Sequence, residues 1–585
     1  MIYFLKKSVP SKKGTYLQIY ANYYDPKTKS KKTKSYKSIG YVCDLQENGI
    51  NDPIAYYTEE VKKMNEELKQ QHEIQICEKS LTKNLGYFLV KGMLDKLDMD
   101  DELNIISQRY KSRYKFSDLF RSMIYAQIID PGSKLKAYER VIPNIYGMDD
   151  YSYDQILDFV NYIGKDYHKY IEILNRHISN TWKRDYSKVY FDCTNYYFEI
   201  DIEDEYRKKG PSKENRKCPI LGQALMLDKS QIPLDTEYYP GNESEKPYLR
   251  KMIEEMKSRN NVRGKVIQVA DKGLNCARNI YSAVVEANDG YIFSKSIKGH
   301  NIDQETKKWL LEDSEEWVDV RNSVGGLIYK YRVEKWRNNK GKIREYGDYE
   351  YHFKPTPDES KEIRFTTKEK RIFTYNPKLA AKQRAEINKE IDKLKNALSY
   401  RVVLKEELGD MSKYVNVESI DDNGKKVKIV TSIDEEKVRE SLDLAGYNLI
   451  VTSEIDANPV DIYDIYHNLW RIEESFRIMK TYLEARPAFL SNEDTVYGHF
   501  TICYIALTLM RLLELKVFND DIPIGQLFEF IREFNVTEVP GGEFINNSTN
   551  RVITEKIKKV LGISKLGNVY LKQTDINSFL NVELD

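Results

Sequence analysis

The chain begins with alternating apolar and polar positions, which is the pattern of β-strands that bury one face. Two such runs lie within residues 1–50, and a turn-like Asp25-Pro26 and several lysines separate them. Between 51 and 182 the apolar positions recur at helical spacing, and one helix is expected to begin at a capping box of Ser152 and Gln155. The pattern predicts a β-rich N-terminal arm over 1–50 and a helical domain over 51–182.

Short apolar strands appear from residue 183 onward, and two of them run directly into an aspartate. Lys188–Phe191 leads into Asp192, and Lys265–Ala270 leads into Asp271. Strands of this kind, separated by longer connections, predict an α/β core whose first part spans 183–299.

A mostly β segment with one long helix is predicted over residues 300–445. Its helix is expected to start at Asn376-Pro377, with asparagine as the N-cap and proline in the first helical position. Asn423-Gly424 is typical of a two-residue hairpin turn. The remaining predicted segments are a second part of the core over 446–515, with a long amphipathic helix over 460–483, and a C-terminal helical region over 516–585.

Charge is informative only in its distribution. The formal net charge is +1, from 92 Lys+Arg against 91 Asp+Glu, so the total charge gives no argument for nucleic-acid binding. Residues 1–45, however, contain ten lysines and only two acids, Asp25 and Asp44. Such an arm is suited to neutralise phosphates, but a solvated surface hairpin has the same composition. The sequence leaves both interpretations open.

Cysteine spacing and hydropathy indicate the cellular compartment in which the protein is expected. The chain has six cysteines and no C-x-x-C pair, so neither a disulfide framework nor a zinc ribbon is expected. The longest apolar run, Phe500–Met510, is shorter than the roughly 20 residues of a membrane span and is predicted as a buried helix. The N-terminus lacks the apolar core of a signal peptide. We expect a protein of a reducing cytoplasm, without a membrane partner.

Asp192, Asp271 and Glu473 are the candidate chemical groups. A carboxylate at the end of a strand has its direction fixed by the sheet, and Glu473 lies on the helix predicted over 460–483. Oxygen ligands of this kind suit Mg²⁺, and two such ions promote phosphodiester cleavage. Strand alternation points the neighbouring Cys193 away from Asp192, so we expect a small buried side chain there and not a nucleophile. Aspartates at strand ends are common in α/β proteins, so this pattern alone is a weak indication.

Three stretches resemble the motifs of bacterial insertion-sequence DDE transposases. Tyr190–Phe198, YFDCTNYYF, is similar to the D-x-T-x-x-Y/F-F stretch around the first aspartate of that family. Val269–Leu274, VADKGL, is similar to the second motif, A-D-[RK]-G. Tyr466–Lys480 resembles the Tyr-x2-Arg-x3-Glu-x6-Lys helix, and a continuous helix places its Tyr, Glu and Lys on one face. With shorter similarities, the resemblance extends from about residue 85 to 515.

The third motif leaves two questions open. Leu469 stands where the family has arginine, and Arg471 and Arg477 are alternative sources of that charge, although neither is in register. Glu474 is a rival to Glu473 for the catalytic carboxylate, because the two lie about 100° apart around a helix. We favour Glu473, which is in register with the motif.

The resemblance implies a fold and an activity. The fold is an α/β ribonuclease H-like catalytic core with a mostly β insertion between the second aspartate and the glutamate, joined to the N-terminal β arm and the helical domain. The activity is that of a transposase, which binds the terminal inverted repeats of its insertion sequence and catalyses metal-dependent DNA cleavage and strand transfer. A domesticated DNA-binding protein without cleavage and a non-transposing ribonuclease H-like nuclease are the alternatives.

The resemblance also implies roles for residues and partners. Mg²⁺, for which Mn²⁺ can substitute, is the implied cofactor, and DNA ends and target DNA are the implied partners of a homodimer in the synaptic complex. The helical domain over 51–182 is the expected DNA-binding domain, with the arm as a second candidate, and the expected location is the nucleoid-associated bacterial cytoplasm. The implied catalytic and metal-binding residues are Asp192, Asp271 and Glu473, and the implied DNA-binding residues are Tyr466, Lys480, Arg477 and Lys272.

Overall fold

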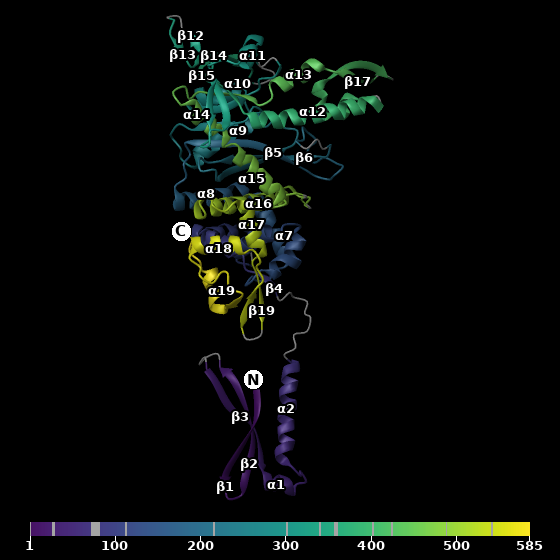
Figure 1. The fold of residues 1–585 in the computed structure, drawn as a ribbon, viewed down its shortest axis with the longest axis vertical. Coiled ribbons are helices and arrows are strands. Elements are labelled where there is room, and N and C mark those ends of the chain that lie inside the picture. Colours follow the sequence, from purple (N-terminus) through teal and green to yellow (C-terminus); the bar gives the residue numbers. More distant parts are fainter. Residues whose placement is uncertain are drawn as a thin grey trace. The chain divides into compact units, whose positions relative to one another are not determined.

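The computed structural model divides the chain into two compact units, Met1–Ser80 and Leu81–Asp585 (Figure 1). The boundary falls inside the range 51–182 that the sequence predicts as one helical domain. The structure describes residues 2–25, 30–71, 82–110, 114–213, 217–299, 302–337, 341–355, 361–400, 403–422, 425–486, 488, 490–539 and 542–584.

The first unit is an antiparallel three-stranded sheet with a helix on one face. Alternate residues of the central strand, Leu17, Ile19 and Ala21, are fully buried, and this alternation is the one that the sequence shows. The strand order is β1-β2-β3. The elements are β1 Ile2–Ser11, β2 Gly14–Asp25, β3 Ser30–Tyr41, α1 Val42–Glu47 and α2 Pro53–Gln71.

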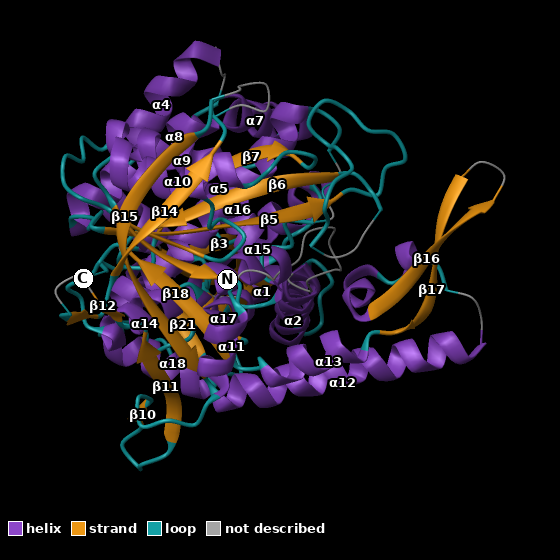
Figure 2. Cartoon of the chain, turned by 90° about the horizontal axis from the view of Figure 1, so that it is seen from above, coloured by secondary structure: helices purple, strands orange, loops and turns teal. Residues whose placement is uncertain are grey.

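A large mixed sheet forms the centre of the second unit (Figure 2). Within the described residues it has ten strands, in the order β10-β11-β15-β18-β9-β8-β5-β6-β7, with β14 paired to β15. The strands are β5 Lys188–Tyr197, β6 Ile220–Leu227, β7 Pro233–Pro240, β8 Ile267–Ala270, β9 Gly290–Lys295, β10 Val318–Arg321, β11 Leu327–Val333, β14 Gly347–Phe353, β15 Ile363–Tyr375 and β18 Tyr447–Thr452.

Both faces of the central part of this sheet are covered, so strands such as β6, β7 and β9 are buried on two sides. In β5 the side chains of Val189, Phe191 and Cys193 belong to the core beneath α9 Lys246–Arg259, whereas Tyr190 and Tyr196 belong to the larger core on the opposite face. Cys193 is 1% exposed, which confirms the expectation of a small buried side chain pointing away from Asp192. The helices on the side of α9 are α10 Ala277–Tyr281 and α11 Gln304–Leu311.

The segment predicted as a β insertion, 300–445, contributes to two different structures. Its strands β10, β11, β14 and β15 extend the central sheet. The rest, from α12 through the β16–β17 hairpin to α13, has a small core of its own that includes Leu394, Tyr414 and Val430. These elements are α12 Pro377–Tyr400, β16 Val415–Asp422, β17 Lys425–Ile433 and α13 Glu435–Asp443.

The N-cap prediction for the long helix is confirmed. Asn376 accepts hydrogen bonds from the backbone N–H groups of Lys378 and Leu379 through its Oδ1, at 3.0 and 3.1 Å. The predicted turn at Asn423-Gly424 lies outside the described residues.

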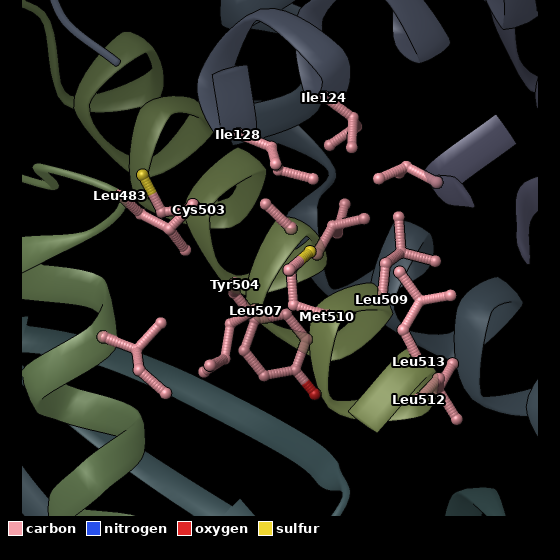
Figure 3. Close-up of a cluster of buried hydrophobic side chains, with 14 of the residues drawn as sticks. Ile124, Ile128, Leu483, Cys503, Tyr504, Leu507, Leu509, Met510, Leu512 and Leu513 are labelled. Carbon is pink, nitrogen blue, oxygen red and sulfur yellow. The ribbon is translucent and has the colours of Figure 1, made fainter. Parts of the chain in front are cut away.

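Helices from both ends of the sequence pack together on the face of the sheet opposite α9. The buried helix α16 contacts α3, α5, α7 and α8, so the helices before residue 182 belong to the same unit as the core. Figure 3 shows side chains of α5 and α16 in one cluster. The helices are α3 Phe88–Leu97, α4 Asp100–Ser107, α5 Phe116–Ile129, α7 Tyr153–Lys165, α8 Tyr167–Trp182, α14 Pro459–His467, α15 Trp470–Thr481 and α16 Glu493–Leu512.

Close packing of α7 on α16 depends on two glycines. A Cβ on Gly164 would lie 1.6 Å from the Asp494 carbonyl oxygen, and one on Gly498 would lie 1.9 Å from the Val160 carbonyl oxygen. The predicted capping box at Ser152 and Gln155 is present at the start of α7. Phe500–Met510 is entirely buried inside α16, as the sequence predicts. Over the described residues, no helix combines the length and apolarity needed to cross a membrane.

The C-terminal region, predicted as helical, also contains strands. Three short strands form a sheet with β4, a strand from the start of the second unit, in the order β21-β20-β19-β4. Weak periodicity in strands of three to five residues explains why the sequence did not reveal them. The elements are β4 Thr82–Asn84, α17 Ile524–Glu533, β19 Asn535–Val539, β20 Glu543–Asn546, α18 Arg551–Leu561, β21 Tyr570–Lys572 and α19 Gln573–Leu580.

Candidate active site

Asp192 lies inside strand β5 and not at its end. The predicted strand end is wrong, because β6 continues to pair with β5 beyond this point, with Asp192 opposite Leu225. On the other side of β5, the parallel strand β8 pairs only as far as Ala270, opposite Phe191. Asp192 and Asp271 are therefore the next residues of two adjacent parallel strands, and this register brings the two carboxylates together.

Two hydroxyl groups hold Asp271. The Ser294 hydroxyl of β9 donates to Asp271 Oδ1 at 2.7 Å, and the Tyr466 hydroxyl of α14 donates to the same oxygen at 3.1 Å. Ser294 is 1% exposed, so its position is set by the sheet. Asp271 follows β8 directly, as the sequence predicts.

The helix predicted over 460–483 is in fact two helices. α14 ends at His467 and α15 begins at Trp470. The turn between them buries Leu469, which is 8% exposed. The argument that a continuous helix aligns Tyr466 with Glu473 is therefore wrong, because the two residues lie on different helices.

Tyr466 and Lys480 nevertheless contact residues on or directly after the neighbouring strands β8 and β5. Tyr466 contacts Asp271, and Lys480 Nζ donates to Thr194 Oγ1 at 2.9 Å. Thr194 is two residues after Asp192 on β5, so both side chains point to the face that α15 covers. The tertiary structure, and not a single continuous helix, thus brings these motif side chains to the catalytic strands.

Burial is the main cause of the raised pKa values of Asp192 and Glu473, and neighbouring like charges add to it. Burial raises the pKa of Asp192 to about 6, and the charges of Glu245 and Asp271 act in the same direction, against Lys213. Desolvation followed by the charge of Asp271 raises the pKa of Glu473. Asp192 and Glu473 are thus destabilised in their charged forms, which a bound cation relieves.

Glu474, the rival carboxylate, lies in the opposite environment. Its Oε2 accepts hydrogen bonds from Arg511 at 2.9 Å and Arg471 at 3.2 Å, and its Oε1 pairs with Arg477 at 3.1 Å. Burial alone raises its pKa, but Arg511 and Arg471 hold the pKa of Glu474 below its ordinary value. Arg511 is fully buried, so this carboxylate is committed to a structural ion pair.

The other predicted contact residues are placed at the surface around these acids. Lys272 follows Asp271 and is exposed. Arg477 retains 66% side-chain exposure while pairing with Glu474. The Arg471 side chain is only 11% exposed and pairs with Glu474, Glu514 and Asp520, so it is not available to replace the arginine that the family motif has at position 469.

Lys213 and Glu245 were missed by the sequence reasoning. Lys213 Nζ donates to the Cys193 carbonyl oxygen and lies 3.8 Å from Asp192 Oδ1 and 3.5 Å from Glu245 Oε1. A cleft of about 360 Å³ beside them is lined by both residues and by Asn195 and Tyr239. Lys213 sits in a loop without periodic pattern, so no local signal in the sequence marks it.

The donor set fits a divalent cation in its chemistry. Carboxylate oxygens are the ligands that Mg²⁺ prefers, and Mg²⁺ is often held by one or two carboxylates with water and substrate phosphate. Among the described residues, no three His, Cys, Asp or Glu side chains are close enough to enclose an ion by themselves. The pair formed by Asp192 and Asp271 therefore leaves coordination positions for other oxygen atoms.

A family model described as the transposase DDE domain matches residues 182–509, more than half of the chain. The chain belongs to this family. It is a DDE transposase, an enzyme that cleaves and transfers DNA, and enzymes of this family use divalent metal ions. The matched range begins just before β5 and ends within α16, so it includes all three acids.

Other comparisons add little to this assignment. No curated protein matches the chain. A cryo-EM structure of a piggyBac transposase synaptic complex with hairpin DNA is similar at 9% sequence identity and a TM-score of 0.33, covering 81% of this chain and 85% of that one. That similarity is too weak to carry any conclusion about this transposase. The mixed sheet of the DDE domain is compatible with the predicted ribonuclease H-like core.

Proposed function

We propose that this transposase acts at the terminal inverted repeats of a bacterial insertion sequence, with Asp192, Asp271 and Glu473 as its catalytic carboxylates in a ribonuclease H-like core. The observation that carries the proposal is the register of β5 and β8, which makes Asp192 and Asp271 neighbours. The electrostatic coupling of Asp271 to Glu473, together with the engagement of Glu474 by Arg511, favours Glu473 as the third acid.

Asp192 and Asp271 are the residues that would hold Mg²⁺, or Mn²⁺ in its place, and Glu473 would join them as the third ligand once the ion is bound. Bound divalent ions supply positive charge that activates the attacking oxygen and stabilises the leaving oxygen of a phosphodiester. Asp271 is oriented for this role by Ser294 and Tyr466.

Basic residues around the acids would position the DNA backbone. Lys480 is held beside Thr194, and Arg477 and Lys272 are exposed near the same helix and strand ends. Lys213 is the cation next to Asp192, and we assign it a contact with the scissile phosphate. Cutting two element ends together requires two active sites, so we propose a homodimer in the synaptic complex.

Cleavage of a labelled duplex that carries the element's terminal repeat tests the proposal. Wild-type protein should cut at the repeat end with Mg²⁺ or Mn²⁺ and not with EDTA. Asp192→Asn, Asp271→Asn and Glu473→Gln should each lower the rate by about a thousandfold, since several kcal/mol of transition-state stabilisation is lost.

Asp464→Asn is the matched control, because it neutralises an exposed acid on α14 outside the site. It should cut as wild type does. Wild-type cleavage that persists in EDTA, or full activity in Glu473→Gln, contradicts the assignment of the site.

A further inference from the structure

The N-terminal sheet has two chemically different faces. One face is apolar and lies under α2, with Leu17, Ile19 and Ala21 fully buried. The helix is fastened to the sheet by Asn65, which accepts from the Tyr3 N–H and donates to the Tyr3 carbonyl oxygen, both at 2.8 Å. Lys37 on β3 pairs with Glu60 of α2 at 3.4 Å. This face is therefore used for folding.

Strand register identifies the residues of the opposite face. Cross-strand partners in an antiparallel sheet share a face, and Gln18 of β2 is opposite Lys6 of β1 and Ser38 of β3. The same alternation places amide, hydroxyl, aromatic and lysine side chains together, and among its described residues there is no acid. This open face includes Ile2, Phe4, Lys6, Ser8, Tyr16, Gln18, Tyr20, Asn22, Lys31, Thr33, Ser35, Ser38 and Tyr41.

The open face is positively charged and its lysines lie across the sheet. By the strand register, the described lysines on this face are Lys6 and Lys31, and no described acid lies beside them. Lys6 Nζ lies 4.5 Å from the Tyr20 ring centroid, which holds this ammonium over the face. Asn22, Lys31 and Thr33 are exposed. The charge is complementary to a polyanion.

The side chains on this face suit a DNA duplex better than a single strand. Asparagine and glutamine amides pair with adenine edges in the major groove, which is wide enough to admit β-strands. Single-strand binding needs aromatic ring faces on which bases stack. Tyr16 and Tyr41 instead pack edge to face, with ring centroids 4.9 Å apart.

We propose that the open face of the N-terminal sheet binds the major groove of double-stranded DNA, with Gln18 and Asn22 contacting base edges and Lys6 and Lys31 contacting phosphates. The occupant is the terminal repeat of the element, so this assignment rests on the proposed function. In this proposal the N-terminal unit recognises the DNA sequence. The helical region, which the sequence predicts as the DNA-binding domain, is packed into the catalytic unit.

Binding of the full-length protein to fluorescent duplexes tests this assignment. The probes are the terminal repeat and a scrambled duplex of the same composition, measured over a range of salt concentrations. The double variant Gln18→Ala/Asn22→Ala should lose about tenfold or more in affinity for the repeat and little for the scrambled duplex, since lost base contacts reduce discrimination.

The lysine variant should behave differently from the amide variant. Lys6→Gln/Lys31→Gln should weaken binding to both duplexes equally and make the slope of log K against log salt shallower by about two. Lys63→Gln, on the exposed side of α2, is the control and should leave both affinities and the preference for the repeat unchanged.

Failure of this assignment is distinct from failure of the proposed function. Unchanged repeat preference in Gln18→Ala/Asn22→Ala would overturn the assignment of the face, as would a loss confined to single-stranded oligonucleotides. Cleavage of saturating DNA should remain within a few-fold of wild type in these variants, because the catalytic acids are in the other unit. A wild-type protein that binds the repeat without cutting it contradicts the proposed activity and leaves the binding face standing.

Discussion

Two neighbouring glutamates on α15 lie in opposite electrostatic environments. Desolvation and then the charge of Asp271 raise the pKa of Glu473. Glu474 is enclosed by Arg471, Arg477 and the fully buried Arg511, and its pKa is lowered. A rotation of about 100° around α15 thus separates a carboxylate beside other acids from a carboxylate that is already neutralised by arginines.

The comparison shows how the same residue type serves activity or stability. A buried ion pair is strongly destabilising to break, because the remaining charge is left uncompensated. A group of like charges is costly to the apo protein but has a strong affinity for added positive charge. We therefore expect substitutions in the two groups to change different measurements.

Exchanging each glutamate for glutamine tests the comparison most directly. Glu473→Gln should lower the cleavage rate about a thousandfold and leave the free energy of unfolding nearly unchanged. Glu474→Gln should lower the free energy of unfolding by about 1 to 2 kcal/mol, since Arg511 loses one charged partner and keeps Glu514 at 2.6 Å. Urea unfolding and single-turnover cleavage measure the two effects.

The rate of Glu474→Gln, expressed per folded molecule, should stay within a few-fold of wild type. Equal rate losses in Glu473→Gln and Glu474→Gln would contradict the assignment of catalysis to Glu473 and of stability to Glu474. Glu474→Asp, which keeps the charge, is the control for the stability effect.

Asp192→Asn should stabilise the apo protein while abolishing cleavage. The pKa of Asp192 is about 6 in the folded chain against an ordinary value of 3.8, so its ionisation at pH 7 opposes folding by about 2 to 3 kcal/mol. Since the folded state binds the proton more tightly, this penalty is full above pH 6 and disappears as pH falls towards 4. Thermal unfolding in EDTA at several pH values measures it.

A variant that is less stable than wild type at pH 7 in EDTA, and equally so at pH 4, would contradict this account. Added Mg²⁺ should reverse the order of stabilities, because wild type gains more from binding the ion.

Lys213→Met should separate metal binding from turnover. Removing the cation beside Asp192 should lower the half-saturating metal concentration, because one competing positive charge is gone. The maximal cleavage rate should fall about tenfold through loss of a phosphate contact. Lys246→Met, on the edge of the same cleft, is the control and should change neither value. Parallel changes in both values would favour a purely structural role for Lys213.

Tyr466→Phe should have the smallest effect. It removes the hydroxyl that donates to Asp271 Oδ1 while Ser294 keeps its own hydrogen bond, so a rate loss of about three- to tenfold is expected. The affinity for DNA at saturating metal should be unchanged if Tyr466 orients the carboxylate. A loss confined to DNA affinity would instead assign Tyr466 to the DNA, as the motif implied.

Most of the secondary structure of the site could be predicted from local pattern. The strand before Asp271, the N-caps at Ser152 and Asn376 and the buried helix around Phe500 are confirmed, because each depends on neighbours within a few residues. The break after His467 could not be predicted, since it buries Leu469 in a core built from distant segments.

The sequence by itself determined which acids are candidates and which family the chain resembles, because motif residues keep their spacing along the chain. Only the tertiary structure decided which glutamate is neutralised, since Arg511 is 37 residues from Glu474. The tertiary structure also placed Lys213 beside Asp192. It buried one face of the N-terminal sheet and left the other open. Charge interactions act through space between segments that are remote in sequence, whereas periodicity records only what each segment buries.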